Sequence, residues 1–494
     1  MTEVLNVQVS GGELAGFLDH GVPAYLGIPY AAPPFGELRM APPVAARPWD
    51  GVRDATRFGS TTPKGGYPPQ YAPLFPDPVI PGEDCLNLNV WTPDPAASGL
   101  PVFAWIHGGS FMNGSGAVAT HRGSSFARDG VVCVTINYRL QAEGFLHAED
   151  GTSNVGLLDQ LAALQWVRDN IAAFGGDPGR VTVGGESAGA MSVTTLLSMP
   201  QSDGLFRAAI TQSGAAAHTL TEQVGTRVTQ FLAAELGVEP THAAISALAP
   251  EQVYAAAEKL TNEVQTAPDV AKWDGLALSL LPFAPTIDGD VLAQDPLTAI
   301  RQGAGADVAL LTGSNGEEAR LFLVAPGAIG LIDEPTALAG AAAYGVDAAK
   351  ALAIYAEEGN TPGDTLAAIV TDWFFAVPAI RVAEARGSAA ATWMYRFDHR
   401  STAYGGLLGA AHAVEIPFTF DTLDAEDTLG LLGPGASQKA ADTVHAAWVR
   451  FITDGDPGWP AYDAEARTTM IFGEVDGPVE QPRAARYALW EGIR

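Results

Sequence analysis

The sequence predicts an α/β fold built on a mostly parallel, doubly wound sheet, and three observations lead to this prediction. Two nearly continuous apolar runs, at 102–106 and 131–138, have the composition of strands that are covered on both faces. Between residues 154 and 174, apolar side chains recur at roughly helical spacing, and Gly175 follows as a helix-ending glycine. The third observation is the order of the segments, because strands that alternate with helices along the chain form parallel sheets.

The N-terminal part of the chain is predicted to be rich in β-structure. Residues 4–30 contain strand-like runs on either side of a glycine turn at Gly11-Gly12. Residues 31–81 are dense in proline and glycine and show little periodicity, so they are predicted to form a long ordered loop. Long loops in compact proteins tend to be functional, and we expect this one to border the mouth of the active site.

The remaining elements are predicted from the same signals. Two alanine-rich segments, 223–272 and 335–388, are predicted to be helical insertions around that mouth, with helices at 337–355 and 365–386 in the second. Because no low-complexity or charged hinge separates these segments, the chain 1–494 is predicted to form a single enlarged domain. Further strands are expected at 86–91, 181–183, 205–213, 308–312 and 392–397, and a C-terminal helix at 437–452.

The charge of the chain restricts the partners that it can bind. The 27 basic and 56 acidic side chains give a net charge of −29, which argues against binding to nucleic acid or to an anionic membrane. We therefore expect a small neutral molecule as the ligand, and we favour a monomer, because like-charged copies repel one another. The N-terminus lacks the basic and apolar segments of a secretory signal, and no apolar run reaches the length of a membrane span. A cytoplasmic location is the resulting expectation.

One short motif indicates a catalytic serine. Gly185-Glu-Ser-Ala-Gly189 follows a predicted strand and precedes a predicted helix, which is the setting that a Gly-x-Ser-x-Gly nucleophile requires. The serine of such a motif sits on a strained turn, and a Cβ at either glycine would crowd that turn. The turn lifts the Ser187 hydroxyl above the sheet and directs the first N–H groups of the helix at its target. An ordinary glycine-rich turn is the alternative, although no other serine fits the motif.

A serine nucleophile needs a base and an acid, which follow it along α/β-hydrolase chains in the order Ser, Asp or Glu, His. His412 is the best candidate for the base, because it lies in a small-residue loop after a predicted strand, and His399 is its closest competitor. Glu317 and Glu318 compete for the acid, since both follow an apolar strand and their spacing does not choose between them.

An oxyanion hole is the third requirement of this chemistry. Gly108 and Gly109 follow the buried strand at 102–106 and can offer two backbone N–H groups, and the Ala188 N–H can supply the third. Glycine at these positions lets the backbone approach a substrate closely. His107 belongs to the same motif, and we expect it to fix the conformation of the loop and not to act as a base.

Five neighbours of these positions have two interpretations each. Glu186 either tunes the electrostatic field around His412 or is a buried, hydrogen-bonded acid. Ser213 either supports His412 through a hydrogen-bond network or is a small packing residue. Three more are either pocket residues or plain core residues: Phe111, Met191 and Phe322.

Taken together, these segments resemble the type-B carboxylesterases, the family that includes the cholinesterases. The resemblance runs over nearly the whole chain and implies an α/β-hydrolase fold. The matching segments are Gly27-Ile-Pro-Tyr-Ala31, Glu83-Asp-Cys-Leu-Asn-Leu-Asn-Val-Trp91, His107-Gly-Gly109, Asn137-Tyr-Arg-Leu140, Asn154-Val-Gly-Leu-Leu-Asp-Gln160, Phe174-Gly-Gly-Asp-Pro178, Gly185-Glu-Ser-Ala-Gly189, Gln212-Ser-Gly214 and His412-Ala-Val-Glu415.

The resemblance also implies roles for individual residues. It implies Ser187 as the nucleophile, Glu318 as the acid and His412 as the base. It selects Glu318 because Gly313-Ser-Asn-Gly-Glu-Glu318 matches the family's Gly-x-Asn-x-Asp-Glu segment, which ends in the acid. It further implies an oxyanion hole formed by Gly108, Gly109 and Ala188. It also implies two structural ion pairs, which would join Arg39 to Glu83 and Arg139 to Asp159.

The chain departs from the family pattern at several positions. Secreted members commonly pair the cysteine at the position of Cys85 with an upstream one, and no cysteine precedes Cys85 here. Cys85 and Cys133 both lie in strand-like runs and are expected to be buried free thiols. Ala319 stands where glycine is common. The loop 64–81 has no tryptophan on which a cholinesterase stacks a quaternary ammonium, so choline specificity is not expected.

We therefore expect a serine carboxylesterase that hydrolyses neutral esters with short- to medium-chain acyl or aryl groups through an acyl-enzyme. Neither a metal nor an organic cofactor is expected. The chain is most similar to bacterial enzymes that act on p-nitrophenyl or p-nitrobenzyl esters, and aromatic diesters such as phthalate or terephthalate esters are the alternative substrates. An amidase with the same triad remains open, whereas a non-catalytic adhesion homologue would lack the nucleophile. Activity is expected to rise with pH as His412 loses its proton, at about pH 6–7.

Overall fold

The computed structural model describes residues 5–266, 269–356, 360–387 and 391–494. Small parts of the predicted elements lie outside the described residues: Val4 of the β-rich segment, and 267–268, 357–359 and 388 of the two helical insertions.

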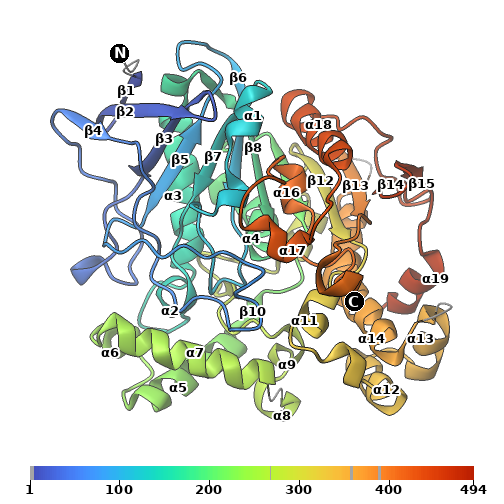
Figure 1. Cartoon of the computed structure of the whole chain (residues 1–494). Coiled ribbons are helices and arrows are strands. Elements are labelled where there is room, and N and C mark those ends of the chain that lie inside the picture. The colour runs from blue at the N-terminus through green and yellow to red at the C-terminus, as the bar shows by residue number, and fades with distance from the viewer. Residues whose placement is uncertain (1–4, 267–268, 357–359, 388–390) are drawn as a thin grey trace.

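A single large sheet runs through the described chain, with helices on both sides (Figure 1). Its strands are β1 Leu5–Val9, β2 Gly12–Asp19, β3 Val22–Pro29, β4 Val52–Asp54, β5 Asn87–Trp91, β6 Leu100–Ile106, β7 Val132–Ile136, β8 Gly176–Glu186, β9 Ala208–Gln212, β12 Ala309–Asn315, β13 Thr392–Phe397, β14 Thr469–Phe472 and β15 Gly477–Val479. The order across the 13-stranded sheet is β1-β2-β3-β5-β7-β6-β8-β9-β12-β13-β14-β15, and β4 pairs with β2. A separate two-stranded sheet joins β10 Leu220–Thr221 to β11 Thr286–Ile287.

The middle of this sheet is parallel, as the sequence predicts. Every pairing from β7 through β6, β8, β9, β12 and β13 to β14 is parallel. On the other side of β7 the sheet continues with antiparallel pairings: β5 pairs with β7, and the N-terminal strands β3, β2 and β1 follow. Because the carboxyl ends of parallel strands meet at one edge, the segments that follow β6, β8, β12 and β13 gather there.

The side chains of β6 show that both faces of the sheet are buried. Val102, Ala104 and Ile106 belong to one core, and Phe103 and Trp105 belong to the other. This alternation is what a strand covered on both faces requires. The first core includes residues of α3 Val155–Asn170 and α4 Ala188–Leu197, and the second includes residues of α18 Gln438–Asp454.

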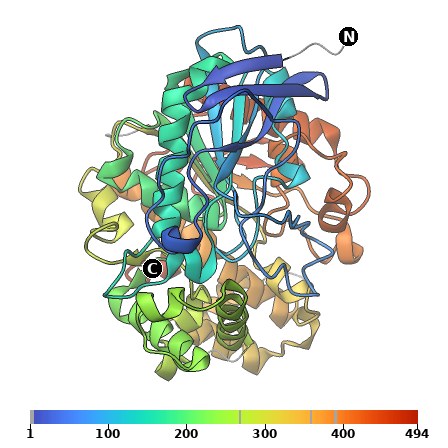
Figure 2. The same cartoon turned by 90° about the vertical axis from the view of Figure 1, so that its left-hand side faces the viewer.

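The two predicted helical insertions lie at the same end of the molecule, far from β1 and β2 (Figures 1 and 2). The first contains α5 Glu222–Leu236, α6 His242–Ser246, α7 Pro250–Thr266 and α8 Val270–Trp273. The second contains α12 Glu334–Ala343, α13 Ala348–Tyr355, α14 Pro362–Thr371, a π-helix at Asp372–Ala376 and α15 Val377–Arg386.

The prediction of one helix at 337–355 is wrong. The chain forms two helices there, α12 and α13, which are bent by 113° relative to each other. Gly345 has φ +85° in the break, and the Asp347 side chain accepts the Lys350 N–H as the cap of α13. A helix-ending glycine followed by a capping aspartate therefore overrides the continuous alanine-rich composition.

The segment 362–386 also differs from the single helix predicted at 365–386. It begins at Pro362 with a capping box made by Thr361 and Asp364, and the π-helix interrupts it. Contrary to the expectation from the sequence, this segment is long and apolar enough to cross a membrane. However, 72% of its apolar window is buried inside the fold, as in the core helix of a globular domain.

Two ion pairs predicted from the family pattern have different outcomes. Arg139 and Asp159 form the predicted pair, at 2.7 Å and fully buried. Arg39 pairs at 2.6 Å with Glu143 of α2 Gln141–Phe145, and the predicted partner Glu83 is exposed. Cys85 and Cys133 are buried free thiols, as predicted.

The remaining helices are short. They are α1 Ser124–Arg128, α9 Leu276–Ser279, α10 Pro296–Arg301, α11 Arg320–Val324, α16 Ile416–Thr419, α17 Thr428–Leu432 and α19 Ala484–Tyr487.

Candidate active site

Ser187 lies on the strained turn that the sequence predicts, between β8 and α4. Its backbone has φ 54° and ψ −122°, a conformation that a residue with a side chain rarely adopts. A Cβ on Gly185 would lie 2.5 Å from the backbone of Gly189, and a Cβ on Gly189 would lie 2.0 Å from the Ile106 carbonyl. The two glycines are therefore required for the turn to pack against the end of β6.

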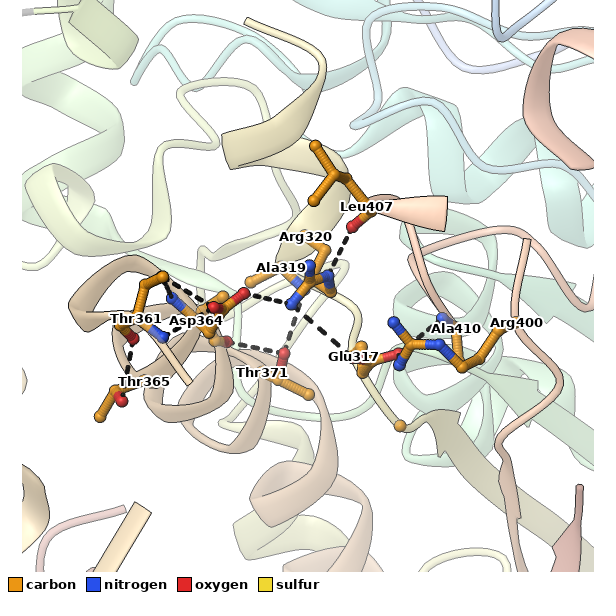
Figure 3. A network of polar contacts seen from close by, with 12 residues as sticks. Glu317, Ala319, Arg320, Thr361, Asp364, Thr365, Thr371, Arg400, Leu407 and Ala410 are labelled. Carbon is orange, nitrogen blue, oxygen red and sulfur yellow. Dashed lines mark hydrogen bonds and ion pairs between the residues drawn. The ribbon is translucent and has the colours of Figure 1, made fainter. Parts of the chain in front are cut away.

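The structure brings Glu318 and His412 together. Glu318 follows β12 and is fully buried, and its Oε2 lies 2.7 Å from His412 Nδ1. Its other oxygen accepts the Asn315 N–H at 2.7 Å, and the Glu318 carbonyl accepts the His412 N–H at 3.2 Å. Of the two candidate acids, Glu318 is thus the one that contacts the imidazole, while the Glu317 carboxylate contacts Arg400 and Ala410 (Figure 3).

His399, the competing candidate for the base, lies elsewhere. Its ring stacks against Phe418 at a centroid distance of 5.8 Å, and its Nε2 is 3.9 Å from Asp476. Neither Ser187 nor Glu318 contacts it among the interactions of the described residues. The choice of His412 over His399, which rests on its small-residue loop, is therefore consistent with the geometry.

Three buried carboxylates surround His412. Its Nε2 lies 3.1 Å from Glu186 Oε1, without hydrogen-bond alignment. Glu415, three residues after His412, accepts hydrogen bonds from Gln212 at 3.2 Å and from Asn315 at 2.5 Å. The role of Glu415 was not predicted from the sequence, although its spacing of three residues from His412 is the signal that could have revealed it.

These carboxylates control the protonation of the site. Burial lowers the pKa of His412, but Glu186, Glu318 and Glu415 together outweigh burial and raise that pKa to about 9. Burial and the neighbouring Glu318 raise the pKa of Glu415 to about 7, and burial raises the pKa of Glu186 above its usual range. We therefore expect His412 to lose its proton above pH 6–7, the range for a histidine without these acidic neighbours.

The Ser187 hydroxyl makes no hydrogen bond to His412 in the described structure, where Nε2 faces Glu186 instead. In unliganded enzymes such catalytic contacts are often long and tighten only in the substrate complex. The Ser213 loop packs against Ser187: a Cβ on Gly214 would lie 2.4 Å from the Ser187 carbonyl. The Ser213 hydroxyl is buried without a hydrogen-bond partner among the described residues, so it makes no hydrogen bond to His412.

The predicted oxyanion loop lies against Ser187. A Cβ on Gly108 would be 3.1 Å from the Ser187 Cβ, and Gly109 has φ +110°. In the described residues no backbone acceptor pairs with the Gly108 or Gly109 N–H, while the Gly109 carbonyl accepts the N–H groups of Met112 and Asn113 at 2.9 Å. Ala188 is the first residue of α4, where an N–H has no partner within the helix.

His107 holds this loop, as expected. Its Nδ1 lies 2.8 Å from the Gly108 carbonyl, and its ring stacks on Tyr138 at 4.6 Å. Burial lowers the pKa of His107 to about 3, so the ring is neutral at physiological pH.

The long loop 31–81 reaches the oxyanion loop through a buried ion pair. Lys64 pairs with Asp77 and donates to the Gly114 carbonyl at 2.8 Å. Asn113 donates to the second oxygen of Asp77 at 3.3 Å. We call these residues, Lys64, Asp77 and Asn113, the oxyanion strap. Tyr67 of the same loop also approaches, since a Cβ on Gly109 would lie 3.1 Å from its hydroxyl.

Two aromatic rings pack on the imidazole of His412. Phe322 is 39% exposed, with its ring 5.5 Å from His412, and Phe375 is buried, with its ring 4.7 Å away. Phe375 was not predicted, because its position depends on the π-helix. Phe111 and Met191, by contrast, are buried in the first core, which favours the interpretation that they are core residues.

The chain is similar to known esterases along its whole length. The family model described as "Carboxylesterase family" matches residues 3–490. A para-nitrobenzyl esterase of Bacillus subtilis (strain 168) is 36% identical over 479 residues, with 93% of each chain covered. A phenmedipham hydrolase of Pseudarthrobacter oxydans is 34% identical over 496 residues, with 96% of each chain covered.

Solved structures agree with these sequence matches. The Geobacillus stearothermophilus carboxylesterase EST55 superposes with a TM-score of 0.85 at 34% identity and covers 98% of this chain and 99% of its own. A PNB esterase structure gives the same TM-score of 0.85 at 33% identity, with the same coverage of 98% and 99%. The protein therefore has an α/β-hydrolase fold, belongs to the carboxylesterase family and is a carboxylic ester hydrolase.

Proposed function

We propose that this protein is a serine carboxylesterase that hydrolyses neutral carboxylic esters with Ser187, His412 and Glu318 as its catalytic triad. The observation that supports this most is the 2.7 Å contact of Glu318 Oε2 with His412 Nδ1, fully buried at the edge of the sheet where Ser187 lies. Histidine held in one tautomer by a buried acid is the arrangement that serine hydrolases require.

The reaction proceeds in two halves. The Ser187 hydroxyl attacks the ester carbonyl carbon and gives its proton to His412 Nε2, and the N–H groups of Gly108, Gly109 and Ala188 stabilise the oxyanion. The imidazolium then protonates the leaving alcohol, which leaves an acyl-Ser187. Water, deprotonated by His412, attacks the acyl group. The bond between the acyl carbon and the Ser187 oxygen then breaks, the imidazolium returns its proton to that oxygen, and the acid is released. For the first proton transfer, substrate binding brings Nε2 from Glu186 to within about 3 Å of the Ser187 oxygen.

Neutral esters with an aromatic component are the substrates that the site supports best. The exposed Phe322 beside the buried Phe375 offers a flat apolar surface next to His412, on which an aryl group can stack. The names of the para-nitrobenzyl esterase and the phenmedipham hydrolase point to aromatic substrates for those relatives. The net charge of −29 disfavours anionic substrates. Aromatic diesters are the alternative substrates. We also propose that the protein is a monomer and that it is located in the cytoplasm.

The first test is hydrolysis of p-nitrophenyl butyrate by the wild type and by Ser187→Ala, with the pre-steady-state burst recorded. The wild type should show a burst, and the variant should lose activity on the order of 10⁵-fold or more. Ser192→Ala is the matched control, because Ser192 lies in α4, which begins directly after Ser187, and in the described part of the chain its hydroxyl accepts a hydrogen bond from Gln160 alone. Equal hydrolysis by wild type and Ser187→Ala would refute the proposal. A panel of acyl-chain lengths, aryl diesters and matched amides would then define the substrate.

A further inference from the structure

The loop that carries Glu318 is tied to the histidine loop by the residue that precedes the acid. Glu317 and Ala410 exchange two hydrogen bonds (Figure 3). The Glu317 N–H donates to the Ala410 carbonyl at 3.0 Å, and the Ala410 N–H donates to Glu317 Oε2 at 2.9 Å. Arg400 donates to the same carboxylate oxygen. Since Ala410 lies two residues before His412, this exchange sets the separation of the two loops.

The Glu317 carboxylate packs tightly against Gly409 of the histidine loop. Gly409 has φ +67°, and a Cβ there would lie 2.4 Å from Glu317 Oε2. The carboxylate therefore packs directly against the backbone of the histidine loop, and a larger residue at position 409 would displace it.

A second arginine anchors both loops to a helix. Arg320 donates through Nε to the Leu407 carbonyl at 2.6 Å and through Nη1 to Asp364 at 2.6 Å. Asp364 belongs to the capping box at the start of α14. The Ala319 N–H donates to Thr371 of the same helix at 3.0 Å. We call the side chains Glu317, Arg320, Asp364 and Arg400 the acid clamp.

We propose that Glu317 is a positioning residue that keeps Glu318 in contact with His412 by holding the two loops together. This inference rests on the proposed function, because it assigns Glu317 a role only if Glu318 and His412 are catalytic. Glu317 acts through its neighbours, since its carboxylate contacts Arg400, Ala410 and Arg320 but not His412. A misplacement of about 1 Å in such a constellation can cost on the order of 100-fold in rate.

The test compares three substitutions of Glu317 in the full-length protein. Glu317→Ala removes the acceptor for Ala410, and kcat should fall on the order of 10- to 100-fold with KM nearly unchanged. Glu317→Gln retains an acceptor and loses only the charge that faces the half-exposed Arg400, so kcat should fall about fivefold or less. Glu317→Asp keeps the charge but shortens the side chain, so it should lie between the two. If Glu317→Ala does not fold, the kcat of Glu317→Asp tests the inference in its place.

A pH profile separates positioning from general damage. The charged groups that face His412 are Glu186, Glu318 and Glu415. Weakening the Glu318 contact removes part of the stabilisation of the imidazolium, so the acidic limb of kcat/KM should move to lower pH in Glu317→Ala and Glu317→Asp. A loss of folded protein alone would scale the profile without moving that limb.

Glu384→Ala is the matched control. The Glu384 side chain is 23% exposed, against 25% for Glu317, and it also accepts from two arginines, Arg381 and Arg467. This variant should keep the kcat and the acidic limb of the wild type. The inference is overturned if Glu317→Ala and Glu317→Asp also keep both, while Glu318→Gln loses activity. If Glu318→Gln stays active, the proposed function fails, and this inference fails with it.

Discussion

The oxyanion strap and the acid clamp hold the two sides of the site by different physical means. In the strap, the Lys64 and Asp77 side chains are 0% and 5% exposed. In the clamp, the Glu317 and Arg400 side chains are 25% and 53% exposed. A buried ion pair cannot lose one partner without leaving an uncompensated charge, whereas a half-exposed pair is screened by water. We therefore expect the strap to contribute mainly to stability, and Glu317 of the clamp to act mainly through the hydrogen bond that its side chain accepts from the Ala410 N–H.

The largest expected effect is on stability, at the strap. Lys64→Met leaves Asp77 buried and unpaired, so the free energy of unfolding should fall by about 3–5 kcal/mol. The double variant Lys64→Met/Asp77→Asn should recover part of this loss, since it removes the uncompensated charge. Urea denaturation at pH 7 measures both. If the free energy of unfolding of Lys64→Met falls by less than about 1 kcal/mol, the strap ion pair would contribute no more to stability than an exposed pair.

The next effect concerns the loop that the strap holds. In Gly109→Ala, the new Cβ would meet the Asn113 carbonyl at 2.3 Å, and φ +110° disfavours any side chain. Displacement of one oxyanion donor should lower kcat by about 10²–10³-fold. Gly130→Ala is the control, because Gly130 also has positive φ, at +92°, but its Cβ would meet nothing within 4 Å. Similar kcat values for the two variants would argue against an oxyanion role for Gly109.

A smaller effect is expected on the pH dependence of kcat/KM, and it tests the Glu186 carboxylate beside His412. Because Glu186 helps to raise the pKa of His412, the wild-type acidic limb of kcat/KM should lie above pH 6.5. Glu186→Gln removes that charge, so the imidazolium loses its proton more readily and the limb should move down by roughly one pH unit. Rates corrected for spontaneous ester hydrolysis between pH 5 and 10 give the result. An unmoved limb would mean that Glu186 is neutral in the free enzyme.

The smallest effect is expected at the exposed end of the clamp. Arg400→Ala should lower the free energy of unfolding by about 1 kcal/mol or less, and this difference should shrink as salt is raised. Lys259→Ala, which breaks a surface pair with Glu235, is the comparison. Arg400→Ala should lower kcat less than Glu317→Ala does if the Ala410 hydrogen bond is what positions the loops. An equal loss of kcat in the two variants would mean that the Arg400–Glu317 ion pair, and not the Ala410 hydrogen bond, positions them.

Some residues of the site were predictable because their signals are local. The Ser187 turn requires glycines at fixed offsets, and the chain order limits where its partners can lie. Glu318 and Glu317 are adjacent, and spacing alone did not separate them. Their different contacts arise from the histidine loop, which is about 90 residues further along the chain.

The sequence by itself determined the alternation of strands and helices, the strained turn at Ser187 and the family, because hydrophobic period and glycine placement act over a few residues. The tertiary structure alone decided which groups meet. Arg39 contacts Glu143 and not Glu83, the π-helix brings Phe375 onto His412, and Glu186 and Glu318 converge on the His412 imidazole. Such contacts join segments far apart in the chain, and their energies depend on burial, which a linear pattern does not encode.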